Sequence, residues 1–230
     1  MRIQDAGAFQ VGVLSEAKLS EERCAKLMEM ANEENSSELL HLLQQAQQIA
    51  EPVVLFGLCT TSYTTDNVVC INGVEIHSRL VAKKLKEQRF CFPFVATVGT
   101  ALENWSQRFR GDFLEEYWAE EIKKAYLQQL TSEFFRYIKE RYPIIDHLAT
   151  LNPGSLVQWP ISGQKELFAI LGGTEFVQKQ IGVRYTDCFL MLPSKSLSGI
   201  GFTSKTPYEN CQYCGRLDCR DRREVPQNGG

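Results

Sequence analysis

The longest amphipathic segment of the chain has an apolar or aromatic residue at every fourth position. The series consists of Leu114, Trp118, Ile122, Tyr126, Leu130, Phe134 and Ile138. Four-residue spacing keeps these side chains along one side of an α-helix, and large apolar side chains of this kind are usually buried. We therefore expect a long helix that starts near Asp112, ends at Tyr142-Pro143 and packs its apolar face against a sheet.

Shorter helices are predicted where a capping hydroxyl begins a periodic segment and a proline or glycine ends it. They cover residues 20–31, 36–50, 78–85 and 164–171. Another helix is expected near Thr100. Thr100 and Glu103 have the Thr-x-x-Glu spacing of a capping box, in which each side chain bonds to the backbone N–H of the other residue.

Short apolar runs between these helices predict strands. The runs are residues 53–59, 68–71, 74–76, 90–97, 184–192 and 196–203. Asn72-Gly73 joins two of them and supplies the positive φ angles of a tight hairpin turn. Pro93 lacks a backbone N–H, so its strand is expected at a sheet edge or at a bulge. Interspersed helices and strands, with few strand–helix–strand units, indicate an α+β fold with a mainly antiparallel twisted sheet flanked by helices.

Length and composition are those of a globular protein with a sizeable core, because 43% of the 230 residues are hydrophobic. We expect a single domain over residues 1–206, of which residues 1–90 form a helical part plus the hairpin. A cysteine-containing tail follows over residues 207–230. The net charge of −3 leaves no excess of cations for phosphate contacts, so no nucleic-acid partner is expected. The sequence has neither a membrane-spanning apolar run nor a secretion signal, which favours a cytoplasmic protein with no membrane partner.

Motifs for common catalytic chemistry are missing from the sequence, and no catalytic residue is predicted. There is no phosphate loop, no dinucleotide-binding glycine motif, no His-Glu-x-x-His and no nucleophile elbow. His41, His77 and His147 are the only histidines, and we expect them at the surface or in capping positions. The acid pairs Glu115-Glu116 and Glu120-Glu121 are expected on the solvated face of the long helix.

Eight cysteines in a chain without a secretion signal predict reduced thiols or a metal site, not disulfides. Those in apolar or periodic segments are expected to behave as small hydrophobes: Cys24, Cys59, Cys70, Cys91 and Cys188. The others form the pattern Cys211-x-x-Cys214-x4-Cys219, which suits zinc or an iron–sulfur cluster. Exposed reduced thiols are the alternative. A fourth ligand is not evident in the tail, and Cys188, Cys59 or a residue of a partner is a candidate.

Two late segments carry a resemblance to a known family. They are Asn152-Pro153-Gly154-Ser155-Leu156 and Cys188-Phe-Leu-Met-Leu-Pro-Ser-Lys-Ser-Leu-Ser-Gly-Ile-Gly-Phe202. With Ala96-Thr97-Val98-Gly99 before a helix and the long helix ending at Tyr142, their order and spacing resemble the reactivation (activation) domain of cobalamin-dependent methionine synthase. The small stand-alone members of that family are more similar still. The best match covers residues 91–206.

The resemblance implies a protein that binds S-adenosylmethionine and docks on the cobalamin module of methionine synthase or another corrinoid protein. Its role there is to help reduce and remethylate an oxidised cobalt, and an electron-donor protein is a further candidate partner. The implied ligand-contacting residues lie in the Pro-Gly loop and near the start of the last strand: Asn152, Pro153, Gly154, Ser155, Ser196, Ser198 and Gly199. An ordinary turn and a bulge are the alternatives at these positions.

The loop departs from the family pattern at two positions. The family has an arginine two residues before the position of Asn152 and a tyrosine at the position of Ser155, where this chain has Thr150 and Ser155. Losing the guanidinium would weaken ligand binding by about 1.5–3 kcal/mol. A binding module that keeps the fold without S-adenosylmethionine is therefore one alternative function. The other is an iron–sulfur or zinc protein that uses its cysteine tail for electron transfer or docking.

Overall fold

The computed structural model describes residues 1–15, 18–143, 147–155, 157–205, 208, 210 and 218. The strands of this part of the chain are β1 (Arg2–Ala6), β2 (Phe9–Val13), β3 (Val53–Phe56), β4 (Cys59–Thr65), β5 (Val68–Ile71), β6 (Val74–His77), β7 (Phe90–Thr97), β8 (His147–Leu151), β9 (Arg184–Tyr185), β10 (Met191–Leu192) and β11 (Ser196–Ser204). The helices are α1 (Glu21–Met28), α2 (Ser36–Ile49), α3 (Arg79–Leu85), α4 (Thr100–Ser106), α5 (Phe113–Arg141), α6 (Gln164–Ile170) and α7 (Thr174–Ile181), with short 3-10 helices η1 (Gln107–Phe109) and η2 (Ile161–Gly163).

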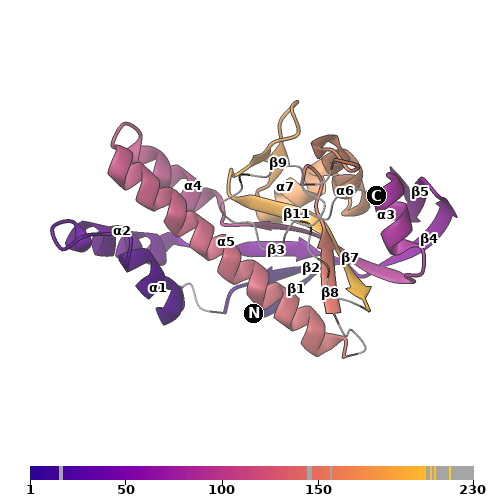
Figure 1. Ribbon diagram of the computed structural model, residues 1–230, viewed down its shortest axis with the longest axis horizontal. Helices are drawn as coiled ribbons and strands as arrows, with labels where there is room; N and C mark the ends of the chain where they lie inside the picture. The colour runs from indigo at the N-terminus through magenta and orange to yellow at the C-terminus, as the bar shows by residue number, and fades with distance from the viewer. Residues whose placement is uncertain are drawn as a thin grey trace.

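The central strand of the main sheet is β7 (Figure 1). It pairs with β3 and then β4 on one side, and with β11 on the other. The sheet continues beyond β3 with β2 and β1, beyond β4 with β5 and β6, and beyond β11 with β8. The described pairs are all antiparallel. The predicted α+β fold, with a mainly antiparallel sheet flanked by helices, is confirmed.

Pro93 lies in this central strand, so of the two expected positions, a sheet edge or a bulge, the edge was wrong. The β3 pairing ends at Phe94 and the β4 pairing begins at Cys91, which leaves Pro93 opposite the link between the two neighbours. The Gly57 N–H in that link donates to the Pro93 carbonyl at 3.1 Å. Because the N–H and C=O of one strand residue point to the same side, the missing donor faces an irregular link, where proline is tolerated.

Different helices cover the two faces of the sheet (Figure 1). On one face, Leu130, Phe134 and Ile138 of α5 pack against Phe56 and Phe94. The other face carries the larger cluster, to which α3, α6 and α7 contribute. Successive residues of a strand point to opposite faces, and β7 therefore supplies both clusters with apolar side chains.

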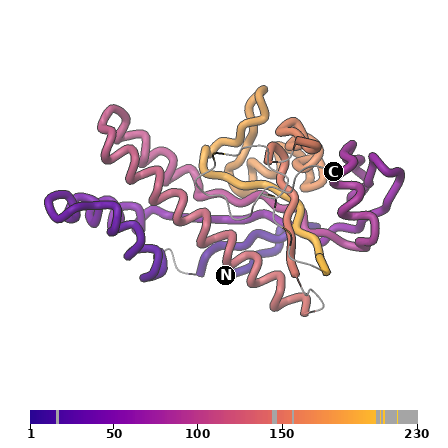
Figure 2. Tube along the Cα trace, viewed as in Figure 1, coloured from indigo at the N-terminus to yellow at the C-terminus, as the bar shows by residue number. Residues whose placement is uncertain are grey.

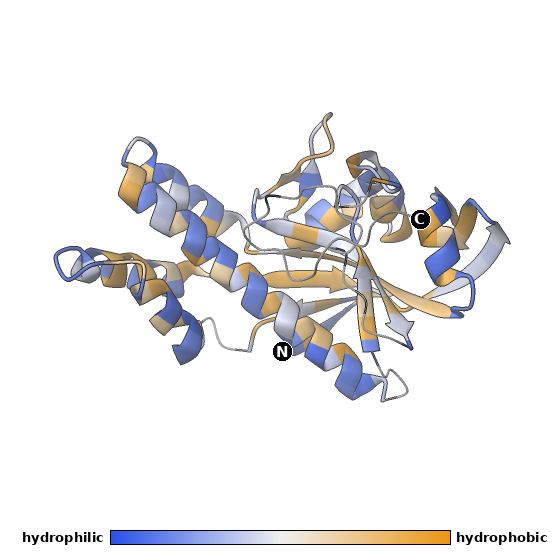
Figure 3. Cartoon of the chain, viewed as in Figure 1, coloured by the Kyte–Doolittle hydropathy of each residue, from blue (hydrophilic) through white to orange (hydrophobic). Residues whose placement is uncertain are grey.

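The N-terminal half of α5 runs beyond the sheet and packs on other helices. Trp118, Ile122 and Tyr126 belong to a cluster that α1, α2 and α4 complete, and we call these helices with this half of α5 the helical arm (Figure 2). In Figure 3 the strands β3 and β7 are mostly apolar, whereas the helices of the arm mix apolar and polar residues. The apolar stripe of α5 thus packs on the sheet only in its second half, and the prediction was wrong for its first half.

Three local start signals were correct, and the one at Thr100 was wrong. The Ser20 and Ser78 hydroxyls cap α1 and α3 by accepting hydrogen bonds from the N–H groups of Arg23 and Val81, at 3.4 and 3.3 Å. Asp112 caps α5 as expected, because its carboxylate accepts hydrogen bonds from the N–H groups of Leu114 and Glu115, each at 3.0 Å. The predicted capping box at Thr100 does not form. Thr100 is the first residue of α4, and Gly99, with φ +87°, occupies the N-cap position without a side-chain bond.

Several element boundaries differ from the predicted ones. The run 53–59 is divided into β3 and β4, and the run 184–192 forms the two-residue strands β9 and β10, which pair with each other. The elements β1, β2, β8 and α7 were not predicted. The Asn72-Gly73 hairpin is confirmed, with φ values of 49° and 83°. Over the described ranges, no helix combines the length and the apolar character needed to span a bilayer.

Candidate functional site

The Pro-Gly loop and the last strand, which the sequence singled out, are in contact. The loop follows β8, and β8 pairs with β11. Asn152 inserts its side chain over β11, where its Nδ2 donates to the Ser198 carbonyl at 2.6 Å. Gly199 makes room for this amide, because a Cβ at residue 199 would lie 2.5 Å from Nδ2. The fold therefore joins two segments that are 46 residues apart.

Hydrogen bonds hold the inner residues of this junction in place. The Ser198 hydroxyl donates to Gln164 Oε1 at 2.9 Å, and the Thr150 hydroxyl donates to Asn152 Oδ1 at 3.3 Å. Asn210 Nδ2 also donates to Asn152 Oδ1. Asn152, Ser198 and Gln164 are all buried. Their polar atoms bond to one another, so their direct role is to fix the loop on the strand.

The outer part of the loop is open to solvent. Gly154 and Ser155 are exposed, whereas Pro153 is buried, as is Gly199 on the strand. Gly154 has φ +83°, its N–H donates to the Trp159 carbonyl at 2.9 Å, and the Ser155 N–H donates to the Asn152 carbonyl at 3.2 Å. A ligand can thus reach the backbone of Gly154 and the hydroxyl of Ser155.

Ser196 lies at the other end of the same stretch of β11, paired with Thr97 of β7. Its hydroxyl is 2.9 Å from Thr97 Oγ1 and 2.7 Å from the Pro193 carbonyl. The Thr97 hydroxyl oxygen also accepts the Gly99 N–H at 3.2 Å. Ser196 is partly exposed, so it can contact a ligand that extends along this end of the sheet.

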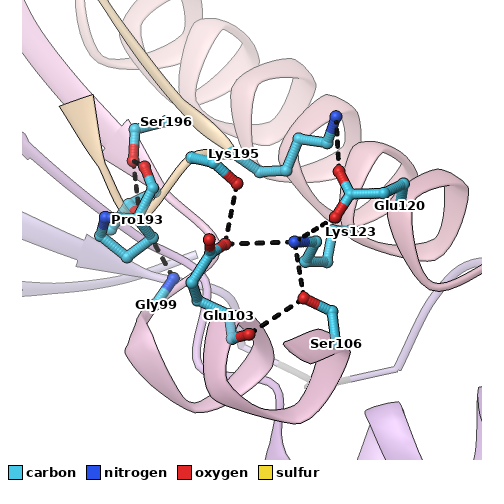
Figure 4. Close-up of polar contacts among 10 residues, drawn as sticks. Gly99, Glu103, Ser106, Glu120, Lys123, Pro193, Lys195 and Ser196 are labelled. Carbon is cyan, nitrogen blue, oxygen red and sulfur yellow. Dashed lines mark hydrogen bonds and ion pairs between the residues drawn. The ribbon is translucent and has the colours of Figure 1, made fainter. Parts of the chain in front are cut away.

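Sequence reasoning missed a buried charged cluster next to Ser196. Lys123 of α5 is only 1% exposed, and its ammonium contacts Glu103 Oε2 at 3.1 Å and Glu120 Oε1 at 2.5 Å (Figure 4). It also donates to the Ser106 hydroxyl at 2.8 Å. Lys123 follows Ala119 by one helical turn, so its place on the buried face could have been found from the spacing.

Glu120 is part of this cluster, so its prediction as a purely solvated acid was wrong. Its second oxygen, Oε2, contacts Lys195 Nζ at 3.0 Å. Burial alone raises the pKa of Glu120, but hydrogen bonds from Lys123 and Lys195 outweigh burial and hold this pKa below its ordinary range. On the other side of Lys123, the Ser194 hydroxyl donates to Glu103 Oε2 at 2.9 Å.

Tyr208 was assigned to a polar tail, but it is buried against the sheet. Its ring packs edge-on to Phe202 of β11 with centroids 5.8 Å apart, and the Lys84 ammonium lies 4.3 Å from its ring centroid. Burial, and secondarily Lys83, lowers the pKa of Lys84. Asn210 bonds to Asn152, so Tyr208 packs on β11 and Asn210 on the Pro-Gly loop.

An open pocket of about 650 Å³ lies beyond β3, at the end of the sheet where Ser196 pairs with Thr97. Its lining includes the apolar residues Val11, Val53 and Ile181 and the charged residues Arg2 and Glu51. None of the predicted ligand-contacting residues lines it, but Gly99 and Thr100, which the sequence analysis also named, do. The strands β7 and β3 separate this pocket from the Pro-Gly loop.

The predicted metal ligands Cys211, Cys214 and Cys219 lie outside the described residues. Among the described residues, no group of three or more His, Cys, Asp or Glu side chains could hold a metal ion. Cys59 and Cys91 are buried, as predicted for small hydrophobes, and they oppose each other on β4 and β7. Cys188 is exposed, so that prediction was wrong for Cys188.

The comparisons with known proteins give a structural similarity and no sequence match. No protein-family model matches the sequence, and a search of curated proteins found no match. Among solved structures, the chain is similar to a crystal structure of the MetH reactivation domain bound to AdoHcy, with a TM-score of 0.59 and 15% sequence identity. The match covers 87% of this chain and 80% of that chain. At this level of identity, the similarity establishes that the chain shares the fold of the MetH reactivation domain.

Proposed function

We propose that this protein binds S-adenosylmethionine and docks on the cobalamin module of a corrinoid methyltransferase, such as methionine synthase, to support its reductive remethylation. The observation that carries the proposal is the junction of Asn152 with Ser198 and Gly199. It brings together the two segments that resemble the family, in a fold shared with a domain whose structure contains AdoHcy. The proposal rests on this coincidence of motif, contact and fold.

The residues of the junction suit a positioning role. Bound S-adenosylmethionine would supply the methyl group together with its own leaving group, so the chain needs no general acid. The buried Asn152 and Gly199 would shape the loop, and Gly154, Ser155 and Ser196 would contact the ligand. Thr150 bonds to Asn152 and cannot grip a carboxylate as a guanidinium does. We therefore expect affinity to come mainly from backbone and hydroxyl contacts.

Isothermal titration with S-adenosylmethionine tests the ligand half of the proposal. We expect saturable heat with the wild-type protein and a weaker Kd with Gly199→Ala, because the added methyl group displaces Asn152. The control is Gly201→Ala on the same strand, where a Cβ would meet its nearest neighbour at 3.4 Å and the loop stays in place. Absence of heat at millimolar ligand with folded protein would contradict the proposal.

Docking requires a separate experiment. The protein is mixed with a corrinoid protein loaded with cob(II)alamin, and both gel-filtration elution and the cobalt absorption spectrum are recorded. Co-elution with a changed spectrum supports docking on the cobalamin module. Co-elution without heat from S-adenosylmethionine would identify the alternative, a docking module that has lost the ligand. Unchanged elution and an unchanged spectrum would refute the docking half.

A further inference from the structure

The Lys123 cluster forms a ring that starts and ends at two adjacent loop residues. Ser194 donates to Glu103, Lys123 bridges Glu103 and Glu120, and Glu120 contacts Lys195. Because Ser194 and Lys195 are neighbours in the sequence, the backbone between them closes this charge ring. Figure 4 shows its members Glu103, Lys123, Glu120 and Lys195. Two carboxylates and two ammonium groups alternate around it, so the ring is neutral when all four are ionised.

Lys123 is the member of the charge ring whose hydrogen-bond donors all have an acceptor. Its ammonium has three N–H donors, and the structure supplies an acceptor for each: Glu103, Glu120 and Ser106. The Ser106 hydroxyl in turn donates to the Glu103 carbonyl at 2.9 Å. With Lys123 1% exposed, the positions of both carboxylates are set from inside the protein.

The loop that the carboxylates hold leads directly into the proposed site. The Val98 N–H donates to the Lys195 carbonyl at 3.2 Å, so the loop backbone is also tied to the end of β7. The next residue, Ser196, contacts Thr97 and the Pro193 carbonyl through its hydroxyl. A shift of Lys195 would therefore move Ser196 and break its contact with Thr97.

We propose that Lys123 is a positioning residue that fixes the Pro193–Ser196 loop, and with it the Ser196 end of the proposed ligand site, through Glu103 and Glu120. The ligand part of this inference rests on the proposed function. Lys123 does not reach the ligand itself, because its side chain is buried and its ammonium contacts Glu103 and Ser106 of α4 and Glu120 of α5. The carboxylates transmit its position, since each of them contacts both Lys123 and a loop residue.

Three variants on the full chain test the inference. Lys195→Met removes the loop end of the ring without leaving an unpaired charge in the core, and Lys195→Arg keeps the cation. Lys123→Met removes the ammonium that bridges Glu103 and Glu120. The matched control is Lys124→Met, because Lys124 lies next to Lys123 on α5 and contacts Glu121 at 3.5 Å. Hydrogen–deuterium exchange of the peptide covering 193–198 and of the Val98 amide is compared with that of β3.

We expect Lys195→Met and Lys123→Met to raise exchange in the loop about tenfold, with little change in β3, and to weaken the Kd for S-adenosylmethionine about tenfold. Lys195→Arg is expected to keep both the loop exchange and the Kd near the wild-type values, and Lys124→Met to change neither. A cluster that acts only on stability would raise exchange in β3 as much as in the loop. That result would overturn the inference, and so would an unchanged Kd in Lys195→Met.

The two proposals fail separately. Absence of S-adenosylmethionine binding by the wild-type protein would refute the proposed function and the ligand part of the inference. The exchange measurement needs no ligand, and it decides by itself whether the ring holds the loop. If the wild-type protein binds S-adenosylmethionine but loop exchange in Lys195→Met is the same as in the wild type, the inference alone is refuted.

Discussion

Gly199 is the residue on which the junction between the Pro-Gly loop and β11 depends. A Cβ at this position would lie 2.5 Å from Asn152 Nδ2 and 2.7 Å from the Leu151 carbonyl oxygen. We expect Gly199→Ala to lower the free energy of unfolding by about 1–3 kcal/mol, the usual cost of overpacking. Urea denaturation followed by circular dichroism measures this loss.

The control for this prediction lies two residues further along β11. Gly201→Ala would bring its Cβ no closer than 3.4 Å to Phe92, which is an ordinary contact. Its unfolding free energy should stay within about 1 kcal/mol of the wild type. Equal losses in the two variants would mean that the amide of Asn152 does not need the space left by Gly199.

Thiol reactivity should divide the described cysteines by their burial. Burial raises the pKa of Cys59 to about 11, and burial followed by the neighbouring Cys59 raises the pKa of Cys91 well above its usual range. Since the thiolate is the reactive form, a maleimide at about pH 8 should modify Cys188 rapidly and leave Cys59 and Cys91 unmodified. Peptide mass spectrometry after short labelling tests this, and rapid labelling of Cys59 would contradict the buried β4–β7 pairing.

At the scale of elements, α5 depends on its start signal. The Asp112 carboxylate accepts two backbone hydrogen bonds at the first turn. Asp112→Ala should therefore lower the unfolding free energy by about 0.5–2 kcal/mol. Asp112→Ser retains an acceptor at the N-cap, so its unfolding free energy should be close to that of the wild type. Thermal or urea denaturation measures both variants. A Ser variant as unstable as the Ala variant would show that the cap contributes little.

The contact between α5 and the β10–β11 loop should weaken in acid. The pKa of Glu120 is lowered in the folded protein, below the ordinary value of 4.5. Its contribution to stability is therefore fully present above that ordinary value and is lost as the pH falls through the folded-state pKa. The charged groups that face it are Lys123 and Lys195.

The variant Glu120→Gln measures this contribution. The difference in unfolding free energy between wild type and Glu120→Gln should be largest near neutral pH and shrink as the pH falls below the ordinary pKa of 4.5. Glu121→Gln, on the adjacent position of α5, should show a smaller difference with a weaker pH dependence. A difference for Glu120→Gln that grows on acidification would contradict the sign of the pKa shift.

At the scale of the whole molecule, the helical arm and the sheet should unfold together. α5 is continuous through both, and its residues belong to the arm cluster at Trp118 and to the sheet cluster at Phe134. The tryptophans report on different regions, because Trp105 and Trp118 lie in the arm and Trp159 in the sheet cluster. Trp→Phe changes can leave either Trp159 alone or Trp105 and Trp118. For both kinds of variant we expect the urea transition followed by fluorescence to coincide with the one followed by circular dichroism.

This experiment also tests the prediction of a single domain over residues 1–206. The control is near- and far-UV circular dichroism of each variant before denaturation, to show that the Trp→Phe changes leave the fold intact. Two separate transitions, one reported by Trp159 and another by the arm tryptophans, would contradict the prediction. They would divide the molecule into a helical unit and a sheet unit.

Local patterns predicted the parts of the fold that depend on local physics. The four-residue stripe of α5, its Asp112 cap and the Asn72-Gly73 hairpin were all evident from spacing and turn chemistry. The short strands β1 and β8 were not, because a few residues carry little periodic signal. Pro93 was expected at an edge or a bulge because the local rule does not consider that two different strands can meet opposite it.

The sequence by itself determined an α+β chain with a long amphipathic helix, and it singled out Asn152 and the last strand as a candidate site. The helix and the fold class follow from residue spacing and side-chain type, which act over a few neighbouring positions, whereas the candidate site follows from the resemblance of two segments to a known family. Only the tertiary structure decided that Asn152 fills the space over Gly199 and that Lys123 is linked to Lys195 through Glu120. Such contacts depend on which strands pair and where a helix crosses the sheet, and the packing of the whole chain sets both.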